Sequence, residues 1–349
     1  MKGRIVVKIG SQVLCDPRGE LNLAVLAQLA GQIAGLAADG WQVLVVSSGA
    51  VAAGHGVAGE AIHRVSDPVA RKQVLAATGQ VRLMENYRAL FAAHGLTVAQ
   101  VLTSKSDFQT RRHYLNMRGC IDGLLAAGII PVVNENDVVS ITELMFTDND
   151  ELAGLLAGMV NADLLCLLST VPGVLDGDPE DPATSCIGTW DDALHRPEEV
   201  VKRGASVLGR GGMHSKLNMA RKTARLGTTV VIAAGSDPDV LRKIAGGQPT
   251  GTRFPALGDA SPAKRWLASA DAHAALGIFY CSVDRYDAAA NEFRQAVRAA
   301  PENPNGHTNL GAVSYFLGRR EEAMQAFEAA IALRPNPGGY SNLGTLYFE

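Results

Sequence analysis

A chain of 349 residues is longer than one hydrophobic core usually supports, so the length predicts two domains. The composition is that of a globular protein, with 47% hydrophobic and 19% charged residues, and 32 basic against 35 acidic side chains give a net charge of −3. Nucleic-acid and membrane-surface binding usually show as a basic excess, so neither a nucleic acid nor a membrane is expected as a partner.

The five cysteines are scattered along the chain and never spaced as CxxC, which argues against disulfides and a zinc site and is typical of a reducing compartment. Cys166 lies in the apolar run of residues 164–168, where we expect it to be a small buried side chain. The N-terminus lacks the apolar region of a signal peptide, and no segment is long and apolar enough to span a bilayer. We therefore expect a cytoplasmic protein.

Short apolar runs alternate with amphipathic helical stretches over the first 254 residues. The runs predict buried parallel strands at residues 5–9, 42–46, 97–102, 129–133, 163–168 and 229–233. Helical spacing covers residues 21–39 and 71–94, and these stretches stop at Gly40 and Gly95. This alternation predicts an α/β fold, a three-layer αβα sandwich with a mostly parallel sheet, whose ligands bind at the carboxyl ends of the strands.

The character of the chain changes after residue 254. Residues 255–269 predict a linker, because their first half is rich in Pro, Gly, Ala and Ser. Residues 270–349 contain only alanine-rich helical patterns. Leu276-Gly277 recurs as Leu310-Gly311 after 34 residues, and the pattern resembles the tetratricopeptide repeat. Two copies are complete and a third is truncated. The segment is expected to be all-α, and its resemblance to tetratricopeptide repeats implies a possible protein or peptide partner.

The first two predicted strands end in residues that suit a phosphate. Lys8 is followed by Ile9-Gly10-Ser11, so an ammonium group could lie beside backbone N–H groups that bind an anion. Ser48-Gly49-Ala50 follows the second strand at an expected helix start, where exposed N–H groups also suit an anion. Taken singly, a solvated strand end and a simple helix N-cap explain the same residues.

Two clusters of amide and carboxyl side chains follow the fourth predicted strand. They read Asn134-Glu135-Asn136-Asp137 and Thr147-Asp148-Asn149-Asp150. A solvated loop could contain the same residue types. However, Asn134 directly follows a buried strand, at the ligand edge of the sheet, which favours binding of a cation, an ammonium group or a hydroxyl.

A glycine-rich segment precedes the helix expected at residues 217–226. It reads Gly209-Arg210-Gly211-Gly212-Met213-His214-Ser215-Lys216. Glycines let the backbone approach a ligand, and Lys216 could meet a phosphoryl group. The segment fits neither GxxxxGK[ST] nor GxGxxG, so the nucleotide site it suggests is not of the P-loop or Rossmann type. We expect His214 to be a partly exposed loop histidine rather than a catalytic base.

Four motifs in a fixed order resemble those of the glutamate 5-kinases in the amino-acid kinase family. They are VVKIGSQVL, VVSSGAVAAG, PVVNENDVV with FTDND, and GRGGMHSK, and the resemblance extends over residues 4–267. It implies the αβα fold, ATP and Mg²⁺, and transfer of the γ-phosphoryl group to the side-chain carboxylate of L-glutamate, the first step of proline synthesis. It also implies feedback inhibition by proline and a homo-oligomer, either a dimer or a tetramer.

The resemblance also implies roles for single residues. It makes Lys8 and Lys216 the lysines at the transferring phosphoryl group and Asp150 the residue that orients them. Glutamate would be bound by Ser48, Asp137 and Asn149, with Asn134, Glu135 and Asp148 in the same loops. The nucleotide positions would be Lys8, Gly10, Gly49, Ser169, Thr170, Gly209, Arg210, Gly211, Gly212, Met213 and Lys216. No protein ligand is expected for the metal, since Mg²⁺ would be bound mainly through ATP.

Two departures from the family pattern leave alternatives open. Ser169-Thr170 stands where the family commonly has Thr-Asp at the nucleotide, and the following VPGV is similar to acetylglutamate kinases. The helical repeats stand where many relatives have a PUA domain. Another amino-acid kinase, such as an acetylglutamate-type enzyme, is therefore one alternative. A partner-binding protein with weakened kinase activity is a second.

Overall fold

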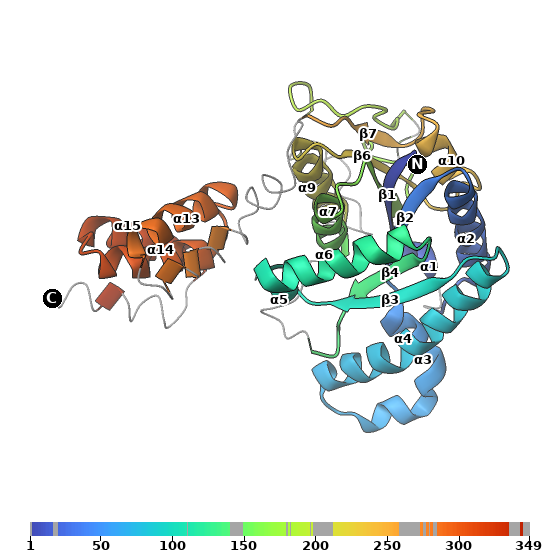
Figure 1. Ribbon diagram of the computed structural model, residues 1–349, viewed down its shortest axis with the longest axis horizontal. Coiled ribbons are helices and arrows are strands. Elements are labelled where there is room, and N and C mark those ends of the chain that lie inside the picture. Colours follow the sequence, from blue (N-terminus) through green and yellow to red (C-terminus); the bar gives the residue numbers. More distant parts are fainter. Residues whose placement is uncertain are drawn as a thin grey trace. The chain divides into compact units, whose positions relative to one another are not determined.

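The computed structural model describes residues 2–16, 20–109, 111–139, 149–178, 181, 183–195, 197, 212–257, 273–274, 277–278, 280–281, 285–334 and 343–344. The chain forms two compact units, residues 1–105 with 117–260 and residues 106–116 with 261–349. The first unit contains the β-sheet, and the second contains the C-terminal helices (Figure 1).

The first unit is built on one seven-stranded sheet in the order β3-β4-β2-β1-β5-β6-β7. Its strands are β1 (Gly3–Ile9), β2 (Trp41–Ser47), β3 (Val98–Thr103), β4 (Ile130–Glu135), β5 (Leu164–Ser169), β6 (Thr229–Ala234) and β7 (Thr252–Phe254). The first six strands pair in parallel, which confirms the predicted parallel sheet, and β7 pairs antiparallel to β6. The sequence did not predict β7, because three residues are too few to show a periodicity.

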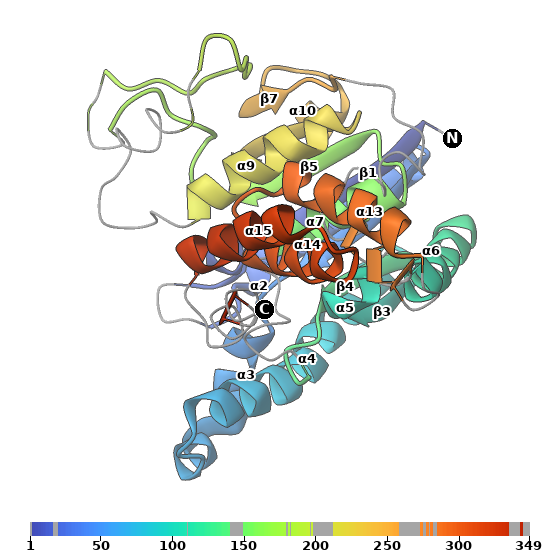
Figure 2. The same ribbon diagram turned by 90° about the vertical axis from the view of Figure 1, so that its left-hand side faces the viewer.

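Helices cover both faces of this sheet (Figures 1 and 2). On one side lie α2 (Leu23–Ala38), α4 (Pro68–Ala92) and α10 (Val240–Ala245), with α3 (Ala50–Ala58) packed on α4. On the other side lie α7 (Asn149–Met159), α9 (Gly212–Arg225) and, from residue 117 on, α6 (Arg111–Ala126). The short helical segments are α1 (Ser11–Leu14), α5 (Ser106–Gln109) and the 3₁₀ helix η1 (Gly59–Arg64).

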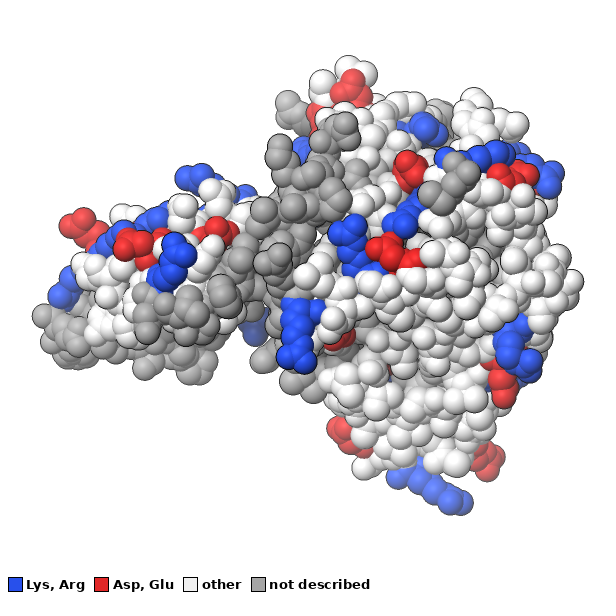
Figure 3. Space-filling model, in the orientation of Figure 1, with Lys and Arg blue, Asp and Glu red and all other residues white. Residues whose placement is uncertain are grey.

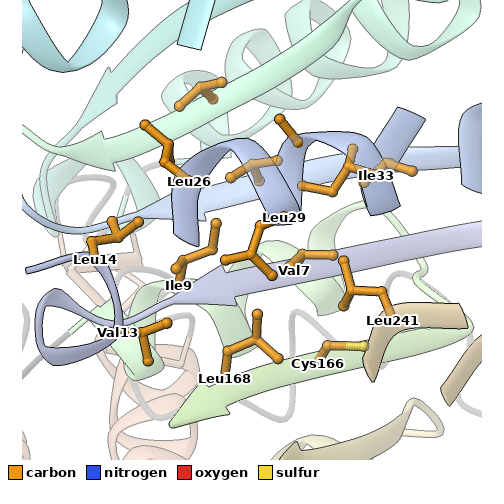
Figure 4. Close-up of a cluster of buried hydrophobic side chains, with 14 of the residues drawn as sticks. Val7, Ile9, Val13, Leu14, Leu26, Leu29, Ile33, Cys166, Leu168 and Leu241 are labelled. Carbon is orange, nitrogen blue, oxygen red and sulfur yellow. The ribbon is translucent and has the colours of Figure 1, made fainter. Parts of the chain in front are cut away.

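The central strand β1 is apolar from Ile5 to Ile9 except at Lys8, because helices cover both faces of the sheet. Val7 and Ile9 pack with Leu29 and Ile33 of α2 and with Leu241 of α10 in one buried cluster (Figure 4). Cys166 of β5 belongs to the same cluster and is fully buried, as predicted. Burial raises the pKa of the Cys166 thiol to about 12, so this cysteine is a core residue rather than a reactive one.

The ends of the two long helices follow from local sequence. The side chains of Asn22 and Asp67 accept hydrogen bonds from the first turns of α2 and α4, and Pro68 occupies the first position of α4. Past the other ends, Gly40 and Gly95 have φ of 89° and 71°, a left-handed conformation that favours glycine. The two predicted helix-terminating glycines are thus confirmed.

Helices α3 and α4 approach each other so closely that two glycines are required. A Cβ atom on Gly79 would overlap the carbonyl oxygen of Ala50 and the backbone nitrogen of Gly54. We expect Gly79→Ala to lower the free energy of unfolding by about 1–3 kcal/mol in urea denaturation, because backbone atoms cannot give way as a flexible side chain can. Gly123→Ala on α6 is the matched control, since a Cβ there meets nothing within 4 Å, and it should be neutral or slightly stabilising.

The second unit contains α13 (Tyr286–Ala299), α14 (Pro304–Phe316) and α15 (Arg320–Leu333). The repeat glycines pack directly against aromatic rings: a Cβ on Gly311 would lie 2.7 Å from the Phe327 ring, and Gly277 meets Phe293 in the equivalent way. Arg294 of α13 binds Glu322 of α15 through two hydrogen bonds of 2.6 and 2.9 Å. Of the predicted third copy only residues 343–344 are described, and Leu343 packs beside Phe327.

Candidate active site

Three charged side chains from separate elements meet at the carboxyl ends of the strands. Lys8 comes from β1, Asp150 from the first turn of α7 and Lys216 from the second turn of α9. The Lys8 Nζ lies 2.6 Å from Asp150 Oδ1, and the Lys216 Nζ donates to Asp150 Oδ2 over 2.9 Å. One carboxylate therefore holds two ammonium groups close together.

This cluster is buried and carries an excess of positive charge. The side chains of Lys8, Lys216 and Asp150 are 5%, 13% and 1% exposed. Two ammonium groups share one carboxylate, so the cluster has a net charge of +1 in surroundings where charges interact more strongly than in water. Such an arrangement favours the arrival of an anion, and a polyphosphate carries the required negative charge.

Glycine lines the approach to Lys8. A Cβ on Gly10 would lie 3.6 Å from the Lys8 Nζ, so a side chain at this position would stand beside the ammonium group. Gly49, with φ of 97°, forms the N-cap of α3 after β2, and a Cβ at this position would lie 3.5 Å from the side chains of Leu14 and Leu21. At Gly10 the chain thus presents backbone rather than a side chain to the lysine, which suits a bound phosphate.

A chain of amide side chains lies beside the charged cluster. Asn149 Nδ2 donates to Ser48 Oγ over 2.8 Å and to Asn134 Oδ1 over 3.2 Å. Asn134 Nδ2 in turn donates to Gln80 Oε1 on α4 over 3.0 Å. The structure therefore brings together three of the predicted acceptor-binding residues and adds Gln80, which the sequence did not identify because α4 shows only a helical pattern.

Two buried atoms of this amide chain have no hydrogen-bond partner among the described residues. They are the acceptor Asn149 Oδ1 and the donor Gln80 Nε2. Leaving a buried polar group unpaired costs about 1–3 kcal/mol, so nearly all such groups in folded proteins are satisfied. An unpaired donor and an unpaired acceptor in one hydrogen-bonded chain are the groups that a polar ligand could satisfy here.

Three predicted acceptor residues lie at or just after the end of β4. Asn134 and Glu135 belong to β4 itself, which extends two residues beyond the predicted strand, and both are buried. Asp137 follows the strand, and its Oδ1 pairs with the Lys72 Nζ of α4 at 3.2 Å. Asp148 lies outside the described residues, so its predicted place in the site stays a prediction.

The predicted nucleotide segment is described only in part. Gly209, Arg210 and Gly211 lie outside the described residues, whereas Gly212 and Met213 form the first turn of α9. The predicted helix start at residue 217 was wrong: α9 begins at Gly212, so Lys216 and the exposed His214 are helical residues and not loop residues. Ser169 ends β5 and Thr170 follows it, more exposed.

An ion-pair cluster holds α9 to the segment of Trp190 and Asp192, next to the bridge between Thr189 and Arg253 of β7. Asp192 accepts from Arg221 Nε over 2.6 Å and from Arg225 over 2.7 Å, and Trp190 Nε1 donates to it over 2.9 Å. The hydrogen bond from Arg221 holds the pKa of Asp192 well below its usual range. Asp192 thereby supports the helix that carries Lys216. The sequence gave no signal for it, because Asp192 is separated from its arginines by about 30 residues.

Comparison with known proteins identifies the family of this site. A model of the amino acid kinase family matches residues 3–234, which contain all three residues of the charged cluster. The chain belongs to the amino acid kinase family. Proteins named glutamate 5-kinase are similar to it: that of Chlorobaculum tepidum is 47% identical over 265 residues, covering 76% of this chain and 72% of that protein. The protein of the same name from Bacteroides thetaiotaomicron is 42% identical, covering 80% of this chain and 79% of that protein.

Solved structures of other proteins share the fold of this amino acid kinase and confirm its three-layer αβα architecture. An isopentenyl phosphate kinase superimposes with a TM-score of 0.51 at 17% identity, covering 72% of this chain and 99% of that one. UMP kinase from Bacillus anthracis superimposes with a TM-score of 0.50 at 17% identity, covering 73% of this chain and 97% of that one. At this identity the likeness concerns the fold alone.

The C-terminal helices match a second family. A tetratricopeptide repeat model covers residues 282–343, which confirms the resemblance seen in the 34-residue pattern. Within the part of the chain that the structure describes, no helix combines the length and apolar character needed to cross a membrane. On the face shown in Figure 3, described Lys and Arg side chains are mixed with Asp and Glu rather than gathered in one basic band.

Proposed function

We propose that this chain transfers the γ-phosphoryl group of ATP to the side-chain carboxylate of L-glutamate, forming L-glutamyl 5-phosphate and ADP. The observation that carries the proposal is the pair of ammonium groups, from Lys8 and Lys216, that a single buried carboxylate holds together. Its support comes from the membership of the amino acid kinase family and from relatives named glutamate 5-kinase at 47% and 42% identity.

The reaction brings two anions together. An oxygen of the glutamate carboxylate attacks the γ-phosphorus, a new P–O bond forms, and the bond from the γ-phosphorus to the bridging oxygen of ADP breaks. No general base is needed, because a carboxylate is already ionised at neutral pH. Catalysis then consists of positioning and charge neutralisation. The ammonium groups of Lys8 and Lys216 supply positive charge next to the phosphoryl oxygens, which carry the negative charge.

Asp150 holds these two ammonium groups in position. Because each of its oxygens contacts a different lysine, Asp150 fixes the distance between them before a substrate arrives. This preorganisation avoids rearranging charges during the reaction. Asp150 is a positioning residue in this proposal, since its carboxylate faces the lysines.

Recognition of glutamate follows from the unpaired acceptor in the amide chain. At neutral pH the only hydrogen-bond donors of free L-glutamate are on its ammonium group, and Asn149 Oδ1 is a buried acceptor without a partner among the described residues. We assign Asn149 to the ammonium group, with Ser48 and Asn134 orienting its amide. Glu135, Asp137 and Asp148 would add negative charge on the same side.

We further assign the nucleotide to the glycine-lined approach at Gly10 and Gly49, to Ser169 and Thr170 after β5, and to the segment of Gly209, Arg210, Gly211, Gly212 and Met213. We propose that Mg²⁺ enters the site bound to ATP. The described residues contain no group of three or more His, Cys, Asp or Glu side chains that could hold a metal. Both oxygens of Asp150 face lysines, so Mg²⁺ would be bound mainly through ATP rather than by this carboxylate.

The experiment that tests the proposal measures ADP release with L-glutamate, N-acetylglutamate and L-aspartate as separate acceptors. We expect turnover with L-glutamate and little with the other two, because acetylation removes the ammonium group and aspartate places its carboxylate one methylene short. Hydroxylamine added to the assay should trap the acyl phosphate as a hydroxamate, which distinguishes transfer to a carboxylate from ATP hydrolysis. Turnover with N-acetylglutamate alone would assign an acetylglutamate-type activity instead.

Two further properties are proposed from the family resemblance. Proline should lower the rate at a fixed glutamate concentration, and the chain should assemble as a dimer or tetramer. The helical repeats at residues 282–343 would contact a protein or peptide partner.

A further inference from the structure

Ser47 is a fully buried hydroxyl residue at the end of β2 that the mechanism above leaves without a role. Its Oγ lies 2.8 Å from the hydroxyl oxygen of Tyr87 on α4 and donates to the backbone carbonyl of Ser48 over 2.9 Å. A carbonyl only accepts, so Ser47 uses its single proton on Ser48, and Tyr87 donates to Ser47. Burial raises the pKa of Tyr87 well above its usual range, so Tyr87 keeps its proton at neutral pH.

The Ser48 carbonyl belongs to the peptide unit that joins Ser48 to Gly49. The peptide units on either side are held by the backbone, because Ser48 N–H donates to Ile9 O over 3.1 Å and Gly49 O accepts from Ala53 N–H over 2.8 Å. Among the described residues, the Ser48 carbonyl itself accepts only from the Ser47 hydroxyl. Gly49 has φ of 97°, and glycine adopts positive and negative φ about equally well, so this peptide plane could turn over while its neighbours stay in place. The Ser47 hydroxyl therefore decides its orientation.

The two faces of the sheet show where the Gly49 N–H points. Ser47 pairs with Ile9 in the register of β1 and β2, on the face covered by α2 and α4, whereas Lys8 lies on the opposite face with α7 and α9. A trans peptide directs its C=O and N–H groups in opposite directions. Because the Ser48 carbonyl turns toward Ser47, the Gly49 N–H turns toward the face of Lys8. This N–H group has no hydrogen-bond partner among the described residues, and Gly49 is only partly buried.

We propose that Ser47 is a positioning residue for phosphoryl transfer. Its hydroxyl, held by Tyr87, fixes the peptide unit after Ser48. The Gly49 N–H is thereby preset to donate to the transferring phosphoryl group beside Lys8. A donor that is oriented before the reaction stabilises the transition state without reorganisation. The inference rests on the proposed function, and it adds the device that holds one backbone donor in place.

The test compares Ser47→Ala with wild type and with Thr228→Val, all in the full chain. Thr228 is a matched control: it is also fully buried and its Oγ1 donates to the carbonyl of Ala162 over 2.9 Å, but it precedes β6 at the amino ends of the strands. For Ser47→Ala we expect kcat to fall about fivefold to twentyfold, because the peptide unit loses the hydrogen bond that orients it. For Thr228→Val we expect a kcat within about twofold of wild type, although its Tm should fall by a similar amount.

The Michaelis constants separate positioning from a general structural defect. The side chain of Ser48 keeps its hydrogen bond with Asn149 when the following peptide unit turns. The KM values of Ser47→Ala for L-glutamate and for ATP should therefore stay within about threefold of wild type, since the lost donor acts on the group in transfer. A distorted site would raise both KM values instead.

A double-mutant cycle tests the part assigned to Tyr87. Tyr87→Phe leaves Ser47 able to donate to Ser48 but no longer holds its hydroxyl, so we expect a smaller loss of kcat, about threefold. Added to Ser47→Ala, the same substitution should change kcat by less than about 1.5-fold, because the group that Tyr87 holds is already gone. Independent effects would multiply.

The inference is overturned if folded Ser47→Ala keeps a kcat within about twofold of wild type, or if its loss lies in the two KM values and not in kcat. A wild-type kcat in Tyr87→Phe, or multiplying effects in the cycle, overturns the part assigned to Tyr87. Ser47→Cys, which carries only a weak donor, replaces Ser47→Ala if the latter does not fold. Failure of both to fold overturns the inference, because Ser47 is then a structural residue.

Failure of the proposed function would look different. Wild type and Thr228→Val would then release no ADP with L-glutamate, whatever the Ser47 variants do. The Ser47 series is in that case judged on whichever acceptor supports ADP release.

Discussion

Replacing Lys216 with alanine is expected to lower kcat at saturating substrates by at least about 10²–10³-fold while the protein stays folded. The substitution removes one of the two ammonium groups that would stabilise charge on the transferring phosphoryl group. Lys8 still pairs with Asp150, so the buried carboxylate keeps a counter-ion and the fold should survive. Steady-state ADP release and thermal melting of the same preparation measure the two effects.

The matched control for this experiment is Lys222→Ala. Lys222 lies on the same helix, α9, but it is exposed and more than one turn beyond Lys216. Its replacement should leave kcat within about twofold of wild type. A folded Lys216→Ala protein that retains wild-type kcat would contradict the role assigned to this lysine, whatever the acceptor proves to be.

The second large effect concerns stability. Asp150→Asn removes the buried carboxylate that contacts both Lys8 and Lys216, so the two ammonium groups lose the negative charge that they share. Removing one partner of a buried ion pair typically costs about 3–5 kcal/mol of unfolding free energy. We expect a loss of this size in urea denaturation, together with a large loss of turnover.

A bound nucleotide should restore part of that stability. The phosphates of a non-hydrolysable ATP analogue supply the negative charge that Asp150→Asn lacks, so the analogue should raise the Tm of the variant more than that of wild type. Asp39→Asn is the control, because the Lys2–Asp39 pair is more than half exposed at 57% and 61% and should contribute less than about 1 kcal/mol. An Asp150→Asn protein as stable as wild type would show that the lysines do not depend on this carboxylate.

Local sequence determined the architecture of the first unit. Six apolar runs became β1 to β6, because strands covered by helices on both faces are apolar along most of their length. Gly40 and Gly95 marked helix ends, since a left-handed residue is needed there and glycine adopts it without strain. The repeat in residues 270–349 was visible because the same residue types return after 34 positions. Each of these signals either spans only a few residues or recurs at a fixed period along the chain.

Only the tertiary structure decided how the site is assembled. The motifs named Lys8, Asp150 and Lys216, but the sharing of one carboxylate by both lysines depends on where β1, α7 and α9 end in space. Gln80 and Asp192 could not be found in the sequence. Their partners lie 54 and about 30 residues away, and a hydrogen bond across such a separation leaves no periodic trace in the chain. Spacing along the chain determines which residues reach the edge of the sheet, and packing determines which of them touch.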